Sequence, residues 1–316
     1  MELNLPILEQ VSNCKSLLIA GMGGGYDVFC GLPIYFDLKK RGFNVHLGNF
    51  SFSDIAGTQY GIRLSPTLVG VTADHEDIYP YFPEFYLSQW LREKLNENIP
   101  IWSFHKTGAV PLSENYQTLA NHLNLDGVLL VDGGVDSLMR GDEEEKGTII
   151  EDATSLYAVN QLQGVSMRML ACVGLGAEQD ITHAQVFENI AALTKAGGFL
   201  GSCSLTSHMQ SCALYAEAVE FVQGQPYHDP SVINSSIISA LNGQFGDYHL
   251  TKKTKGSHLW ISPLMPLVWF FDFNVVTQHN YFLSELRGTQ TFRDALFKVM
   301  AYTEILPRRS TSKIPL

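Results

Sequence analysis

The sequence lacks the features that would place this protein in a membrane or in a disulfide-stapled scaffold. It has five cysteines in 316 residues, an odd number with no C-x-x-C pair, so we expect reduced thiols. The longest apolar stretch, residues 261–271, contains two prolines and is far shorter than the ~20 residues of a membrane-spanning helix. The N-terminal segment has an early acid and no basic region, which argues against a signal peptide. A cytoplasmic protein is therefore expected.

Basic residues are also scarce. Lys and Arg total 21 against 32 Asp and Glu, which gives a net charge of −11 and disfavours nucleic acid or an anionic membrane as a partner. The basic residues Arg308 and Arg309 lie near the C-terminus, where a solvated tail is the simplest prediction. The 45% hydrophobic fraction suits an ordinary globular protein, and a homo-oligomer stays open.

Apolar runs alternate with helical patterns along the chain. This order predicts a Rossmann-like three-layer α/β/α fold with a mostly parallel, doubly wound sheet. We expect one α/β domain over residues 1–316, with a less regular C-terminal region from about 224 packed on it. Within that region a helix is expected at residues 264–271. Earlier in the chain, a helix with Ser113 as its N-terminal cap is expected. The expected strands are residues 17–19, 44–48, 67–72, 101–104, 127–131, 167–173 and 199–205.

A glycine-rich turn follows the first expected strand. Gly21, Gly23, Gly24 and Gly25 precede a helix, so backbone N–H groups and the helix dipole would attract an anion there. A tight turn with only a structural role is the alternative. Asp27, near the first helical turn, suits a cationic or metal-bound ligand better than a bare phosphate.

A dinucleotide site matches this turn poorly. Tyr26 stands where the third glycine of G-x-G-x-x-G belongs, and Asn49 follows the second strand where an acid would bind ribose. Asn49 stays a candidate ligand-binding residue.

An acidic segment follows the strand at residues 127–131. Residues 132–152 carry eight carboxylates against Arg140 and Lys146, and such a density suits Mg²⁺ or another divalent cation. Asp132 and Asp136 are the best candidate ligands or acid–base groups, and Asp142 is a further candidate ligand. The alternative is that residues 142–145 form a solvated loop, while Glu151 and Asp152 complement a helix N-terminus.

Three further residues are candidates for a site at the carboxyl ends of the strands. Arg140 would clamp a substrate anion, or pair with a neighbouring acid. His183 or Glu178 would assist proton transfer, although a neutral capping or packing histidine is the favoured interpretation of His183.

The chain resembles the bacterial and archaeal proteins grouped as domain of unknown function 1152. The resemblance rests on GMGGGYDVFCGLP (residues 21–33), VHLGNFSF (45–52), VDGGVDSLMRGDE (131–143), the GTIIED that follows, and HAQVFENIAALT (183–194). It implies a single α/β unit with a glycine-rich first turn and no established activity. Family-like positions are Gly23, Gly24, Gly25, Asp27, Asp132, Gly133, Gly134, Asp136, Gly141, Asp142 and Glu143.

These patterns favour an enzyme that acts on a small anionic metabolite, a nucleotide or phosphorylated compound, with Mg²⁺ or another divalent cation as the candidate cofactor. A hydrolase or transferase is favoured over an oxidoreductase. The alternatives are a non-catalytic sensor or interaction module with the same pocket and, third, an NAD-dependent oxidoreductase.

Overall fold

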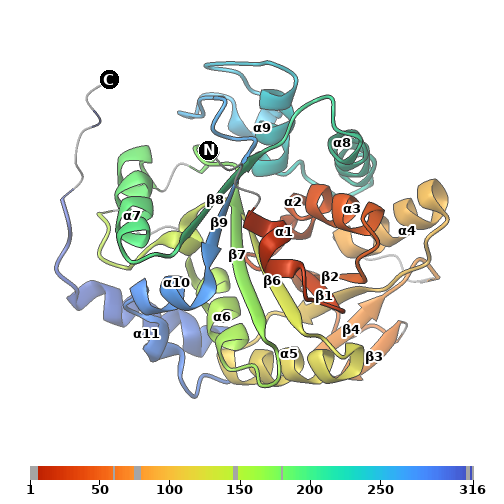
Figure 1. Ribbon diagram of the computed structural model, residues 1–316, viewed down its shortest axis with the longest axis horizontal. Helices are drawn as coiled ribbons and strands as arrows, with labels where there is room; N and C mark the ends of the chain where they lie inside the picture. The colour runs from red at the N-terminus through yellow and green to blue at the C-terminus, as the bar shows by residue number, and fades with distance from the viewer. Residues whose placement is uncertain are drawn as a thin grey trace.

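The computed structural model describes residues 6–59, 61–74, 80–144, 149–178, 181–310 and 314. The described strands form one nine-stranded sheet in the order β3-β4-β5-β2-β1-β6-β7-β9-β8 (Figure 1). The strands are β1 (Leu17–Gly21), β2 (Val45–Ser51), β3 (Ile62–Ser65), β4 (Leu68–Val71), β5 (Ile101–His105), β6 (Gly127–Gly133), β7 (Met167–Val173), β8 (Phe199–Ser204) and β9 (Leu267–Asp272).

Helices and short 3₁₀ turns connect the strands. The helices are α1 (Pro6–Val11), α2 (Asp27–Cys30), α3 (Leu32–Lys40), α4 (Pro83–Leu95), α5 (Ala109–Leu123), α6 (Ile149–Asn160), α7 (His183–Lys195), α8 (Gln210–Gln223), α9 (Val232–Leu241), α10 (Phe273–His279) and α11 (Phe292–Ile305). The 3₁₀ turns are η1 (Asp136–Leu138), η2 (Lys252–Thr254) and η3 (Leu283–Leu286).

The five central strands, β5, β2, β1, β6 and β7, are parallel. From β1 the chain passes through β2 to β3 and β4 at one edge of the sheet and comes back to β5 beside β2. It then crosses to the other side of β1 as β6. The strand order therefore reverses between β1 and β6. In open α/β sheets the crevice outside the carboxyl ends of the strands at such a switch point is where ligands bind.

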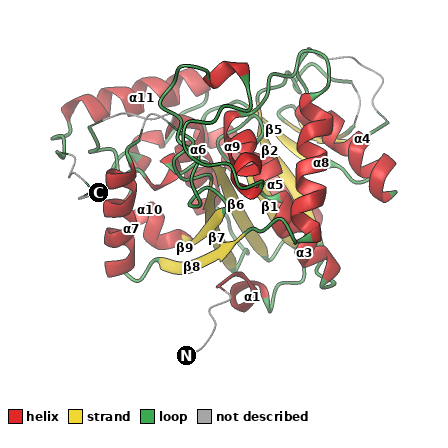
Figure 2. Cartoon of the chain, turned by 90° about the horizontal axis from the view of Figure 1, so that it is seen from above, coloured by secondary structure: helices red, strands yellow, loops and turns green. Residues whose placement is uncertain are grey.

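Side chains of the central strands alternate between two apolar layers. Leu18, Val128 and Leu130 pack in one layer with residues of α5, α6, α7, α10 and α11. Leu17, Ile19 and neighbouring strand residues pack in the other with residues of α2, α3, α4, α8 and α9. Figure 2 shows α7, α10 and α11 on one side of the strands and α3, α4 and α8 on the other. The predicted three-layer α/β/α fold is confirmed.

Two local predictions are wrong. Residues 267–272 form strand β9, antiparallel to β7 and β8, where a helix was expected. Its β-branched and aromatic side chains favour a strand, and Val268 and Phe271 alternate between the two layers. Helix α5 begins at Ala109, with Gly108 as its N-cap in place of Ser113. Pro111 fits there because the first turn of a helix needs no N–H at that position.

Among the described residues no helix is both long and apolar enough to cross a membrane.

Candidate functional site

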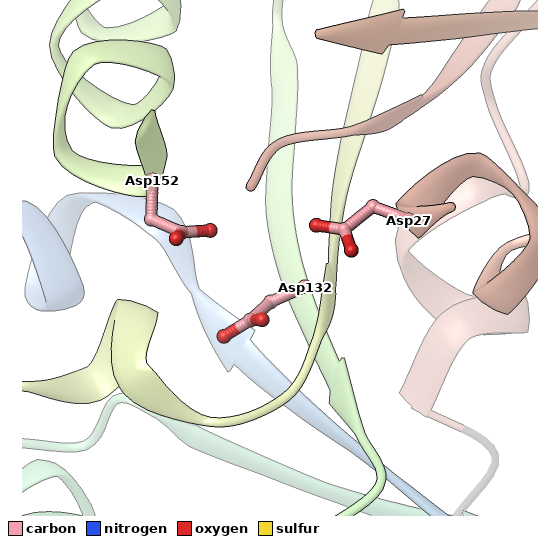
Figure 3. A group of neighbouring side chains, drawn as sticks. All are labelled: Asp27, Asp132 and Asp152. Atoms are coloured by element: carbon pink, nitrogen blue, oxygen red, sulfur yellow. The ribbon is translucent and has the colours of Figure 1, made fainter. Parts of the chain in front are cut away.

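Three aspartates converge at the switch point. Asp27 begins α2, Asp132 lies near the end of β6, and Asp152 lies in the first turn of α6. One carboxylate oxygen from each can be chosen so that all three lie within 4.8 Å of one another. Figure 3 shows the side chains reaching toward a common space from three separate elements. We call Asp27, Asp132 and Asp152 the aspartate cluster.

The glycine-rich turn holds one member of this cluster. Gly24 and Gly25 have φ angles of 98° and 59°, which glycine adopts without strain. The turn brings the Gly23 N–H to 2.7 Å from Asp27 Oδ2, and the Gly133 N–H also donates to the Asp27 carboxylate. The anion in contact with these N–H groups is thus the carboxylate of Asp27 itself.

Asn49 braces the turn from β2. Its Nδ2 donates to the Gly25 carbonyl at 2.9 Å and to Glu84 Oε1 at 2.8 Å, and its Oδ1 accepts from the Val28 N–H at 3.3 Å. A Cβ at Gly21 would lie 2.5 Å from Asn49 Oδ1, so only glycine permits this approach. These contacts give Asn49 a positioning role at the start of α2.

Asp132 is fixed by the 3₁₀ turn that follows β6. The Ser137 hydroxyl and main-chain N–H both donate to Asp132 Oδ2. One oxygen of this buried carboxylate is therefore anchored to the chain.

Asp152 differs from the other two aspartates. Its side chain is only 3% exposed, and its Oδ1 has no hydrogen-bond partner among the described residues. A buried carboxylate oxygen without a donor is costly unless a proton or a cation compensates it.

Electrostatics in the cluster favour neutralisation. Burial raises the pKa of Asp27 to about 7, and the charge of Asp136 adds to the shift. Burial also raises the pKa values of Asp132 and Asp152 well above their ordinary range, with Asp136 as a further cause for both. Lys106 pairs with the adjacent Glu151 at 2.7 Å, at the edge of the cluster.

Glycines leave room for these carboxylates. A Cβ at Gly23 would lie 2.8 Å from Asp27 Oδ2 and 3.0 Å from both oxygens of Asp152. At Gly134 it would lie 2.4 Å from a Glu178 oxygen. The absence of a Cβ at Gly23 therefore lets the carboxylates of Asp27 and Asp152 lie next to this residue.

Among the predicted acid–base groups outside the cluster, Asp136 and Glu178 interact electrostatically with it. Glu178 accepts a hydrogen bond from the Val135 N–H at 2.8 Å, and burial, followed by the charges of Asp136 and Asp132, raises its pKa well above its ordinary range. His183 is half-buried beside Gly176 and Phe187, and burial lowers its pKa. No described contact joins His183 to the aspartate cluster.

Arg140 and Asp142 belong to a second ionic group. The Arg140 guanidinium lies 3.6 Å from Asp142 Oδ2 and stacks over Tyr281, to whose hydroxyl it also donates. Asp142 also lies 3.3 Å from the Arg309 guanidinium. Within the described residues, Asp142 is not part of the three-carboxylate group.

The interpretation of two charged segments as solvated is wrong for Glu143 and for Arg309. Glu143 is buried, and it accepts from the main-chain N–H groups of Arg140 and Gly141, from Asn189 and from Arg309, so it is not part of a solvated loop. Arg309 pairs with Glu143 and with Glu188, so the C-terminal segment is not simply solvated. Glu145 lies outside the described residues.

Sequence reasoning missed Asp152 as a candidate ligand, because an acid in a first helical turn has a simpler explanation. Its membership of the acidic segment was the available signal. The sequence pattern does not show that α6 directs the Asp152 side chain toward Asp27, because α6 and α2 cover opposite faces of the sheet.

The fold and the cluster define an α/β protein with a doubly wound sheet and a carboxylate-lined switch point. The family model described as "Protein of unknown function (DUF1152)" matches residues 89–307, more than two thirds of the chain. The chain belongs to this family, as its motifs predicted. The match includes Asp132 and Asp152 but begins after the glycine-rich turn and Asp27. No curated protein and no solved structure matches the chain.

Proposed function

We propose that this protein is an enzyme that acts on a small anionic metabolite, such as a nucleotide or another phosphorylated compound, through a divalent cation held by the aspartate cluster. The observation that carries the proposal is the convergence of three carboxylate oxygens within 4.8 Å, together with the buried, unpartnered Oδ1 of Asp152. Carboxylate oxygens are the ligands that Mg²⁺ and Mn²⁺ prefer, and a cation would relieve the repulsion between them.

The residues around the cluster then have distinct tasks. The turn at residues 21–25 positions Asp27, and glycine at position 23 leaves space for the carboxylates of Asp27 and Asp152. Asp27, Asp132 and Asp152 would hold the cation through their carboxylate oxygens, and water and an oxygen of the anion would complete its set of ligands. A cation bound here would polarise that oxygen and lower the pKa of bound water.

Proton transfer in this proposal belongs to Asp136 and Glu178, which both interact electrostatically with Asp132. Burial raises the pKa of Glu178, so this carboxyl group can hold a proton that a carboxyl group in water would lose, and it can act as a general acid or base. His183 is the alternative group for this step, although the described contacts favour Glu178.

Metal binding tests the proposal directly. We expect isothermal titration calorimetry with Mn²⁺ to give one tight site in the wild-type protein and at least tenfold weaker binding in Asp152→Asn. Glu217→Gln is the matched control, because Glu217 is an exposed acid paired with Lys94. Asp142→Asn should bind Mn²⁺ like the wild type. A wild-type protein that binds no Mn²⁺, or an Asp152→Asn variant with unchanged affinity, would refute the cation site.

Catalysis requires a second measurement. Thermal shifts across nucleotides and sugar phosphates, with and without Mn²⁺, should identify ligands, since a compound that binds only the native state raises the melting temperature. With such a ligand, Asp136→Asn should abolish turnover while the fold is retained. If the wild type binds the ligand without converting it, the chain is a sensor and not an enzyme.

A further inference from the structure

A cavity of about 140 Å³ lies between α11, the first turn of α6 and the loop that follows η1. None of its described lining residues belongs to the aspartate cluster. They are Met139, Gly141, Glu143, Ile149, Ile150, Leu296, Val299, Met300, Thr303 and Arg308.

The walls of this cavity are mainly apolar. Ile149 and Ile150 begin α6, and Leu296 and Val299 lie on the facing side of α11. Protein interiors are normally packed to the density of organic crystals, so a space of this size between two helices is unusual. An apolar cavity of about 150 Å³ in another protein stays dry and takes up a benzene-sized molecule. The volume thus fits a ring or a short branched chain.

A positive charge lies at the edge of the cavity. The Arg308 guanidinium donates to the main-chain carbonyls of Glu143 and Thr303, both at 2.9 Å, and these oxygens carry no formal charge. The carboxylate of Glu143 is engaged by Arg309 and not by Arg308. A guanidinium has five N–H donors, and two hydrogen bonds leave donors available for a further acceptor.

We propose that this cavity binds a small carboxylic acid with an apolar body of about benzoate size. The body lies between α6 and α11, and the carboxylate pairs with Arg308. This site is separate from the proposed cation site. It adjoins the first turn of the helix that carries Asp152, so its occupant contacts an element of the functional site without contacting the aspartate cluster.

Calorimetric titration with benzoate tests the proposal, with benzyl alcohol and benzylamine as probes of similar shape and different charge. EDTA is present throughout, so that benzoate cannot bind through a metal ion. Arg308→Met removes the charge and keeps an apolar side chain, and Val299→Phe fills the cavity. Arg293→Met is the control, because Arg293 lies on the same helix and contacts Phe297 outside the cavity.

We expect the wild type and Arg293→Met to bind benzoate equally, Arg308→Met to bind at least tenfold more weakly, and benzyl alcohol and benzylamine to bind at least tenfold more weakly than benzoate. Val299→Phe, checked for folding by its melting curve, should bind none of the three. Absence of benzoate binding by the folded wild type, or equal binding by Arg308→Met, overturns the proposal. So does a preference for benzyl alcohol or benzylamine.

Discussion

Removal of one charge from the aspartate cluster should stabilise the metal-free protein. At a separation of 4.8 Å and an effective dielectric constant of about 20, two carboxylates repel each other by about 3.5 kcal/mol. Asp152 faces both Asp27 and Asp132, and partial protonation of the cluster reduces the repulsion that is present near neutral pH. We therefore expect Asp152→Asn to raise the free energy of unfolding by about 1–3 kcal/mol at pH 8, or about 1.5–4.5 °C in melting temperature.

The assay is thermal unfolding in EDTA at pH 8, followed by the same scan with excess Mn²⁺. The order should reverse on adding Mn²⁺, because the wild type gains stability by binding the ion and Asp152→Asn gains little. Glu217→Gln should follow the wild type in both scans. If Asp152→Asn is less stable than the wild type in EDTA, the Asp152 carboxylate does not destabilise the metal-free protein by repulsion. The argument that a cation must compensate this repulsion then fails.

Three other outcomes are expected. Below pH 7 the folded metal-free protein holds a proton on Asp27 that the unfolded chain does not bind until about pH 3.8, so the stability of the protein should increase as the pH falls. Between pH 8 and 5.5 Asp27 contributes about 2 kcal/mol to this increase, and the raised pKa values of Asp132 and Asp152 act in the same direction. Urea titrations measure the increase, and its absence would contradict the raised pKa of Asp27. Gly23→Ala should weaken Mn²⁺ binding at least tenfold in calorimetry, because its Cβ would crowd two carboxylates, whereas Gly57→Ala should not. Arg309→Met should lower the free energy of unfolding by about 2–4 kcal/mol, because it leaves the buried carboxylate of Glu143 without its cation. Chemical denaturation measures this loss. A loss no larger than that caused by removing an exposed arginine would show that the main-chain N–H donors alone stabilise Glu143.

Strand and helix patterns predicted the parallel centre of the fold because each of those strands is a short apolar run buried on both faces. Strand β7 (Met167–Val173) has the bounds expected from the sequence. Residues 267–272 were misassigned because a short apolar run has the same composition in a buried helix and in a buried strand. Residues 267–272 form a strand because they pair with β7 and β8, and the local sequence does not encode this pairing.

The candidate site was predicted in part for a related reason. Asp27 follows β1 after the glycine-rich turn, and Asp132 lies near the end of β6. The carboxyl ends of parallel strands meet at one edge of a sheet. Asp152 and Arg309 are positioned by helix packing and by a C-terminal segment that returns across the molecule. Their partners are distant in sequence, so spacing along the chain carries no information about them.

Strand β9 also sets an order of events during biosynthesis. It enters the sheet between β7 and β8, although it follows β7 by about one hundred residues. On the ribosome, β7 and β8 emerge first and must wait several seconds, at ~5–20 residues per second, for the strand that joins them. Until then β7 presents an unpaired edge, which is a template for association with other chains. Nascent chains that stall before residue 267 are therefore expected to need chaperone protection, whereas completed chains are not.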